Sequence, residues 1–261
     1  MQPTLAHSLR VQSRVVGALL VRESLTRYGR HNLGFLWMFL EPMLFTIGVT
    51  ALWIAMRATH VSTLPIVAFA LTGYSSVLLW RSMPTRCLSA LEANKALLHH
   101  RNVRVMDLYI TRILLEALGV TMSFMLLTTL FWATDLLALP EDVLTVAAGW
   151  SLLAWFGGAL GIVLGCLGER SELVDRLWHP FSYLMFPLSG AAFMVDWLPP
   201  SAREVILLFP MVHCTEMIRA GYLGASLRTH YDAGYVVVCC LALTLIGSAL
   251  LRDTTRRVGV E

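Results

Sequence analysis

The chain has 261 residues, of which 57% are hydrophobic and 14% are charged, and its mean hydropathy is +0.66. Soluble domains average nearer half apolar and a quarter charged, so this composition excludes a disordered chain and an ordinary soluble globule. The five cysteines are odd in number and irregularly spaced, which excludes a disulfide framework and a cysteine metal site. We therefore expect an all-α integral membrane protein.

Six stretches are long and apolar enough to cross the hydrocarbon core of a bilayer, which takes roughly 17–25 helical residues. They cover residues 33–56, 64–80, 106–134, 143–167, 177–195 and 232–251. The arginine-rich leader has only a short apolar run, so we expect it to be retained rather than cleaved as a signal peptide. One domain is predicted, with a cytoplasmic interface segment (1–32), a six-span core (33–251) and a cytoplasmic tail (252–261).

Basic residues are distributed unevenly between the predicted loops. With the N-terminus inside, fifteen lysines and arginines fall in inner segments and four in outer segments. Inner loops of membrane proteins carry the excess of positive charge. Both termini are therefore expected in the cytoplasm.

The segment 199–228 is apolar but interrupted by Pro210, His213, Glu216 and Arg219. A seventh crossing here would place the arginines of the tail outside. The sequence favours two short helices, about 201–209 and 213–224, that enter the outer leaflet and return. A plain amphipathic surface loop is the alternative.

The chain lacks the motifs of an enzyme that works alone. Its only lysine, Lys95, lies between Asn94 and Ala96, which excludes a P-loop. Basic residues near the predicted spans are not interleaved with exposed aromatics, so nucleic acid is not an expected partner. Glu41 and Glu116 are the only carboxylates well inside spans, too few to indicate an ion-coupled pump, and Glu116 is spaced to pair with Arg112. We therefore expect this chain to be one subunit of a larger complex.

Between the second and third spans, residues 84–98 predict an amphipathic cytoplasmic helix of about four turns. Pro84 suits its first turn, and Leu88, Leu91 and Leu98 form one apolar stripe. Such a helix can lie on the lipid surface or dock in the groove of a partner subunit. Periodicity alone does not separate these alternatives.

Three ordered segments carry a family pattern over residues 22–225. They are Thr26–Arg30 with Leu33–Trp37 and Glu41-Pro42; Leu91–Asn94 with Leu97-Leu98 and Arg101–Asp107; and Phe209–His213 with Glu216 and Arg219. The set resembles ABC-2-type permeases that export cell-surface polysaccharide, and the loop around Glu92 is closest to the capsular polysaccharide exporters. Phe209 departs from the pattern, since the family commonly has Asn before this proline.

The resemblance implies a non-enzymatic half-transporter in the bacterial inner (cytoplasmic) membrane. It implies a homodimer with two copies of a separate ABC ATPase subunit, which alone would use ATP and Mg, while this chain binds no cofactor or metal. Residues 84–98 would be the coupling helix, residues 5–28 an interface helix against membrane lipids, and 168–175 a second inner contact. The residues expected to contact the ATPase are Leu88, Leu91, Glu92, Asn94, Glu169 and Glu172.

In this family the first and fifth spans line the path of the polymer. Aromatic faces suit the apolar side of a sugar ring, so the candidate path residues are Trp37, Trp53, Tyr183, Phe186 and Phe193. The fifth span is expected to be kinked by Pro180 and Pro187. The re-entrant pair would form an outer gate with Pro210, His213, Glu216 and Arg219.

Gly157, Gly161 and Gly165 lie one turn apart on the fourth span, which permits close helix approach. Packing within one protomer is favoured over a dimer seam.

The expected function is ATP-driven export of a capsular, lipid-linked polysaccharide, continued by periplasmic and outer-membrane proteins. O-antigen or teichoic-acid export is the alternative within the class. A stand-alone secondary transporter is the alternative outside it.

Overall fold

The computed structural model describes residues 5–28, 34–55, 65–98, 103–224 and 228–258, and these ranges form helices joined by turns and loops, without strands. The long helices are α1 (Leu5–Tyr28), α2 (Gly34–Ala55), α3 (Ile66–Leu88), α5 (Val105–Ala133), α6 (Val143–Gly168), α7 (Glu172–Leu188), α9 (Pro210–Leu223) and α10 (Ala233–Val258). The short ones are η2 (Glu92–Asn94), α4 (Lys95–Leu98), η3 (Val195–Trp197) and α8 (Pro200–Ile206).

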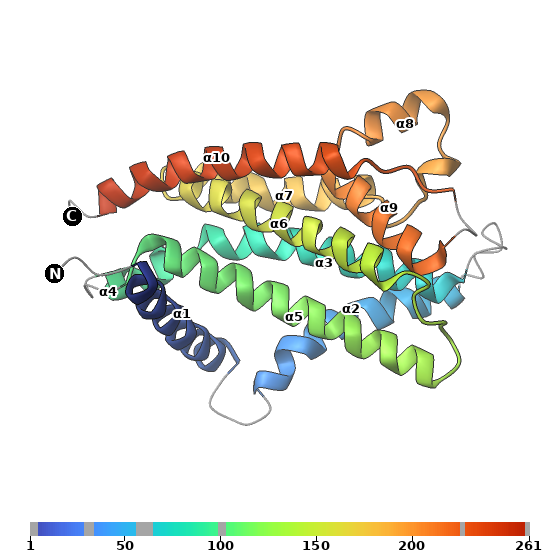
Figure 1. Cartoon of the computed structure of the whole chain (residues 1–261), viewed down its shortest axis with the longest axis horizontal. Coiled ribbons are helices and arrows are strands. Elements are labelled where there is room, and N and C mark those ends of the chain that lie inside the picture. The colour runs from blue at the N-terminus through green and yellow to red at the C-terminus, as the bar shows by residue number, and fades with distance from the viewer. Residues whose placement is uncertain (1–4, 29–33, 56–64, 99–102, 225–227, 259–261) are drawn as a thin grey trace.

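The helices α3, α5, α6 and α10 run along the long axis of the molecule, with α1 and α2 beside α5 (Figure 1). One end holds α4 and both ends of the chain, and we call it the termini end. The opposite end holds α8 and α9, and we call it the hairpin end. The two ends are therefore built from different sets of connecting segments.

Helix α3 is the centre of the bundle and contacts α2, α5, α6, α7 and α9. The glycine face of α6 packs directly on it. A Cβ atom added to Gly157 would lie 2.9 Å from the Trp80 Cα atom, and one added to Gly161 would lie 3.1 Å from the Cys87 sulfur. The structure thus shows this face packed within the protomer, as the sequence favours.

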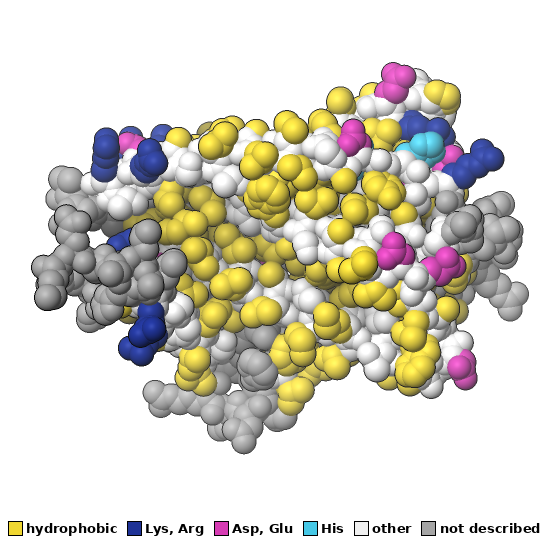
Figure 2. Space-filling view, viewed as in Figure 1, with side chains coloured by type: hydrophobic (Ala, Val, Ile, Leu, Met, Phe, Trp, Pro, Cys, Tyr) yellow, Lys and Arg dark blue, Asp and Glu magenta, His cyan; other side chains and the backbone are white. Residues whose placement is uncertain are grey.

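Four helices of the described chain are long and apolar enough to cross a membrane, judged by length and composition: α3, α5, α6 and α10. Helix α2 contains a shorter apolar stretch, Phe39–Leu52. Figure 2 shows an apolar band over the middle of the visible face, with charged side chains gathered toward the two ends. Large apolar side chains such as Met125 (57% exposed) and Leu245 (70% exposed) point outward. This outward apolar surface is that of a protein whose solvent is lipid.

The expected four-turn helix over residues 84–98 is wrong. Helix α3 continues through Pro84 to Leu88, the chain then turns, and η2 and α4 follow as short pieces. The turn carries Leu91 inward to a cluster with Leu19 and Tyr109. The leucines thus pack in the chain's own core instead of forming an outward stripe.

The predicted fifth span is shifted. It begins at Glu172, where the Ser171 hydroxyl accepts a hydrogen bond from the Leu173 amide, and ends at Leu188 rather than at residue 195. Gly190 follows with φ +79°, a conformation that stops a helix and favours glycine. Both predicted prolines lie inside α7.

The expected pair of short helices is present as α8 and α9. Pro200 and Pro210 each occupy a first-turn position, where a missing N–H costs nothing. Pro210 therefore begins α9 instead of interrupting it. Entry of this pair into the outer leaflet stays a prediction.

Candidate functional site

The termini end presents an exposed polar surface. We call it the inner surface, and it consists of Ser89, Glu92, Ala93, Lys95 and Ala96 together with Glu169–Glu172. Three of the residues predicted to contact an ATPase, Glu92, Glu169 and Glu172, lie on it. The other three point inward: Leu88, Leu91 and Asn94 are 9%, 2% and 5% exposed. These three side chains therefore pack beneath the inner surface and hold it in place.

Asn94 fixes the inner surface to the N-terminal helix. Its side-chain nitrogen donates to the Ala90 carbonyl (2.9 Å), and its side-chain oxygen accepts from Arg22 Nη1 of α1 (2.8 Å). Glu23, the next residue on α1, forms an ion pair of 2.9 Å with Arg112 of α5. The position of Arg22 among apolar residues of α1, which periodicity does not explain, is accounted for by this contact.

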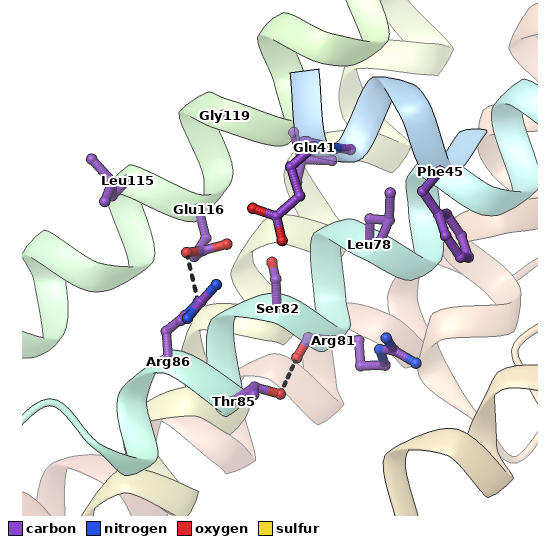
Figure 3. Close-up of a pocket in the computed structure, with 12 residues that line it drawn as sticks. Glu41, Phe45, Leu78, Arg81, Ser82, Thr85, Arg86, Leu115, Glu116 and Gly119 are labelled. Carbon is purple, nitrogen blue, oxygen red and sulfur yellow. Dashed lines mark hydrogen bonds and ion pairs between the residues drawn. The ribbon is translucent and has the colours of Figure 1, made fainter. Parts of the chain in front are cut away.

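A pocket of about 370 Å³ lies between α2, α3 and α5 (Figure 3). Its polar lining residues are Glu41, Arg81, Ser82, Thr85, Arg86 and Glu116. The Arg86 Nε atom lies 3.3 Å from a Glu116 carboxylate oxygen. Because arginines inside a membrane-spanning bundle are costly unless paired, such a pocket marks a functional candidate.

Sequence reasoning did not identify the pocket arginines. The predicted second span ends at residue 80, so Arg81 falls in an inner loop and Arg86 in the predicted cytoplasmic helix 84–98, whereas α3 carries both. Glu116 pairs across helices with Arg86, and Arg112 pairs across helices with Glu23. A clue was present in the continuous apolar and aromatic run before Arg81, since nothing in the sequence stops the helix there.

An aromatic surface adjoins the pocket. The guanidinium carbon of Arg81 lies 4.6 Å from the centre of the Tyr183 ring on α7. Phe186, one turn farther along α7, lies 5.5 Å from Tyr74, and Tyr74 lies 6.2 Å from Phe45 of α2. The structure therefore brings the predicted path residues Tyr183 and Phe186 together beside the pocket.

The remaining path residues lie elsewhere. Trp37 is 52% exposed on α2, one turn before Glu41. Phe193 is half-buried and packs with Val195 in a separate apolar cluster at the hairpin end. The side chain of Trp53 lies outside the described residues.

The residues expected to form an outer gate are engaged with backbone. Arg219 is fully buried and donates to the carbonyls of Gly190 (2.7 Å), Ala191 (2.9 Å) and Phe193 (2.7 Å). Glu216 lies 3.8 Å from Arg219, and one of its oxygens accepts from the His230 amide (3.1 Å). These two side chains hold the turns on either side of the helix pair.

His213 bridges two further segments. Its Nδ1 accepts from the Asp232 amide (2.9 Å), so Nε2 carries the proton and donates to the Leu207 carbonyl (2.7 Å). Pro210, half-buried, opens the same helix. All of the predicted gate side chains therefore belong to α9, and the three polar ones anchor it. In the described part of the chain, no group of three His, Cys, Asp or Glu side chains could hold a metal ion.

An all-helical chain with several helices of membrane-spanning length, an exposed inner surface and a polar pocket between helices defines an integral membrane subunit. The chain belongs to the ABC-2 type transporter family, whose profile matches residues 14–223.

Three curated relatives align over nearly their whole length. The chain is 42% identical over 254 residues to the capsule polysaccharide export inner-membrane protein CtrC of Neisseria meningitidis serogroup B, covering 97% of this chain and 95% of that protein. It is 40% identical over 258 residues to BexB of Haemophilus influenzae, with the same description, covering 99% and 97%. It is 29% identical over 252 residues to the polysialic acid transport protein KpsM of Escherichia coli, covering 93% and 94%. The resemblance seen in the sequence is confirmed.

Proposed function

We propose that this chain is the permease subunit of an ABC transporter that exports capsular, lipid-linked polysaccharide across the bacterial inner membrane. The observation that carries the proposal is the nearly full-length likeness to capsule export inner-membrane proteins. This likeness also favours capsule over O-antigen or teichoic acid as the exported polymer. Proteins of the periplasm and outer membrane would continue the route.

Energy for export would come from a separate ATPase subunit that binds ATP and Mg. The sequence has no P-loop, so the chain must receive this energy through a contact. The inner surface is the proposed contact, because Glu92, Glu169 and Glu172 are exposed and the segments that carry them follow Leu88 and Gly168, which are in contact. The hydrogen bond between Asn94 and Arg22 of α1 would transmit a movement of the inner surface to the helices of the bundle.

The proposed topology has six crossings, with both termini in the cytoplasm. Helix α2 has 22 residues, about 33 Å at 1.5 Å per residue, and α7 has 17 residues, about 26 Å. Both lengths are close to the hydrocarbon thickness of a bilayer, roughly 30 Å. The helix pair α8 and α9 would lie in the outer leaflet, where its burial of Arg219 and Glu216 removes charge from lipid.

The path of the polymer would follow the faces of α2 and α7. Trp37 and Tyr183 are exposed on these helices, and Phe186 lies in the aromatic row beside them. One protomer leaves this face open, so a second copy related by two-fold symmetry would enclose the path. Two ATPase subunits would then bind the two inner surfaces.

The test is reconstitution of the chain with its ATPase subunit in inside-out vesicles, with polysaccharide uptake measured with and without ATP. We expect uptake only with ATP, and loss of uptake for Glu92→Arg on the inner surface. Glu204→Arg is the matched control, because Glu204 is exposed on α8 at the hairpin end. Uptake by the chain alone, driven by an ion gradient, would instead establish a secondary transporter.

A further inference from the structure

The two arginines of the pocket differ in their electrostatic surroundings. Arg86 lies 3.3 Å from Glu116 and is neutralised by it. Within the described part of the chain, no carboxylate lies at ion-pair distance from Arg81, whose guanidinium faces the Tyr183 ring at 4.6 Å. A cation–π contact leaves the guanidinium positively charged and its N–H groups able to donate. Arg81 therefore offers an unneutralised cation at the edge of the pocket.

Glu41 is the other charged group on the pocket wall, and it is set apart from Arg81. Figure 3 shows its carboxylate pointing toward Ser82, on the side where Arg86 and Glu116 pair. The Arg81 side chain extends toward the opposite side. The pocket thus has a side where opposite charges meet and a side where a cation faces an aromatic ring.

Tyr183 provides a surface for stacking beside this cation. Its side chain is 64% exposed on α7, and α7 is fixed to α3 by a hydrogen bond from the Trp178 indole to the Thr85 hydroxyl (2.9 Å). The row formed by Phe186, Tyr74 and Phe45 continues the aromatic surface across three helices. A guanidinium recognises carboxylate and phosphate groups through paired N–H donors. A guanidinium next to an open phenol ring suits a sugar ring that bears an anionic group.

We propose that Arg81 and Tyr183 form a binding subsite for one acidic sugar unit of the exported polymer. The guanidinium pairs with the carboxylate or phosphate of that unit, and the phenol ring stacks on its apolar face. This inference rests on the proposed export function and adds to it a residue pair that selects for acidic polymers. The phosphate of a lipid anchor presents the same chemistry, and the test separates the two sources.

Binding is measured by fluorescence anisotropy on the permease–ATPase complex in phosphatidylcholine nanodiscs. The probes are labelled oligosialic acid and neutral dextran of matched length. We expect tighter binding of the acidic probe, by about tenfold, as a charge-assisted pair would give. Arg81→Gln should abolish this preference and Arg81→Lys should keep part of it. Arg203→Gln, which alters a cation at the hairpin end, is the matched control and should change nothing.

The ring is tested separately. Tyr183→Phe should bind both probes as the wild type does, whereas Tyr183→Leu should weaken both, because stacking needs the ring and not the hydroxyl. Weakening by Tyr183→Phe equal to that by Tyr183→Leu would contradict the stacking role.

A second set of nanodiscs containing phosphatidylglycerol identifies the source of the anion. The measurement is the rise in thermal stability that phosphatidylglycerol gives the complex. If Arg81→Gln loses only this rise and keeps its preference for the acidic probe, the anion is the lipid phosphate. If Arg81→Gln keeps wild-type binding of the acidic probe and wild-type stabilisation by phosphatidylglycerol, the proposed subsite is wrong. ATP-driven transport by Arg81→Gln would show that the export function holds even so. A wild-type complex that transports no polysaccharide would overturn the export function itself.

Discussion

The guanidinium of Arg22 on α1 donates a 2.8 Å hydrogen bond to the side-chain oxygen of Asn94, which lies 72 residues farther along the chain. Asn94 is buried between the exposed residues Ala93 and Lys95 of the inner surface. The adjacent Glu23 ties α1 to Arg112 of α5. Direct polar contacts therefore join the inner surface to α1, and α1 to α5.

Asn94→Leu should uncouple the ATPase from export while the protein still inserts into the membrane. Leucine removes the acceptor for Arg22, and a hydrogen bond to a charged group contributes about 1.5–3 kcal/mol. Asn94→Asp should retain more function than Asn94→Leu, because a carboxylate accepts from the same guanidinium although it cannot donate to the Ala90 carbonyl. The measurement is polysaccharide export per ATP hydrolysed in reconstituted vesicles.

The double variant Arg22→Gln/Asn94→Leu identifies the contact itself. If the two residues act through one hydrogen bond, the double variant should be no worse than the more severe single variant. Fully additive losses would show that Arg22 and Asn94 act independently.

Leu91 and Glu92 are adjacent but should fail in different ways. Leu91 is buried, so Leu91→Ala should lower the free energy of unfolding by about 2–5 kcal/mol. Glu92 is exposed, so Glu92→Arg should leave stability unchanged and reduce co-purification of the ATPase subunit. Thermal unfolding and pull-down of each variant separate the two effects, and normal pull-down by Glu92→Arg would remove Glu92 from the contact.

The sequence predicts the helices better than their ends. Apolar length located α2, α3, α5, α6, α7 and α10, because a membrane-spanning segment must satisfy its backbone internally and so reads as a long apolar run. Helix α1 was expected only from the family resemblance. The ends of α3 and α7 have other causes: Pro84 is tolerated within α3, and the positive φ of Gly190 stops α7. Neither feature has a periodic signal.

The candidate site was predictable only in part. Tyr183 and Phe186 were identified because aromatic side chains on a span are visible in the sequence. The partner of Arg81 on α7 and the partner of Arg22 after α3 are set by helix packing between distant segments. The inward turn of Leu91 has the same cause, since an amphipathic stripe does not state whether its apolar side meets a partner or the chain itself.

Gly157→Ala should destabilise the bundle. Its new Cβ would lie 2.9 Å from the Trp80 Cα atom, and backbone cannot rotate away as a side chain can. Overpacking of this kind costs about 1–3 kcal/mol. Gly48→Ala is the control, because no atom lies within 4 Å of its Cβ position, and alanine favours the helix. The thermal midpoint of each purified variant is the measurement, and destabilisation by Gly48→Ala would point to a neighbouring chain on α2.

Arg219→Lys should loosen the hairpin end although it keeps the positive charge. The arginine fork reaches three carbonyls between residues 190 and 193, and a compact ammonium group on a different stem cannot reproduce this geometry. Each buried carbonyl left without a donor costs about 1–3 kcal/mol. Hydrogen exchange should therefore rise at residues 190–195.

Glu216→Gln is the matched variant, since it leaves all three carbonyl contacts of Arg219 in place. A glutamine oxygen can still accept from the His230 amide but not from the Val195 amide as well, so the control is read at residues 190–193, where exchange should rise less than in Arg219→Lys. If Arg219→Lys exchanges as slowly as the wild type, the three carbonyl bonds do not hold the turn.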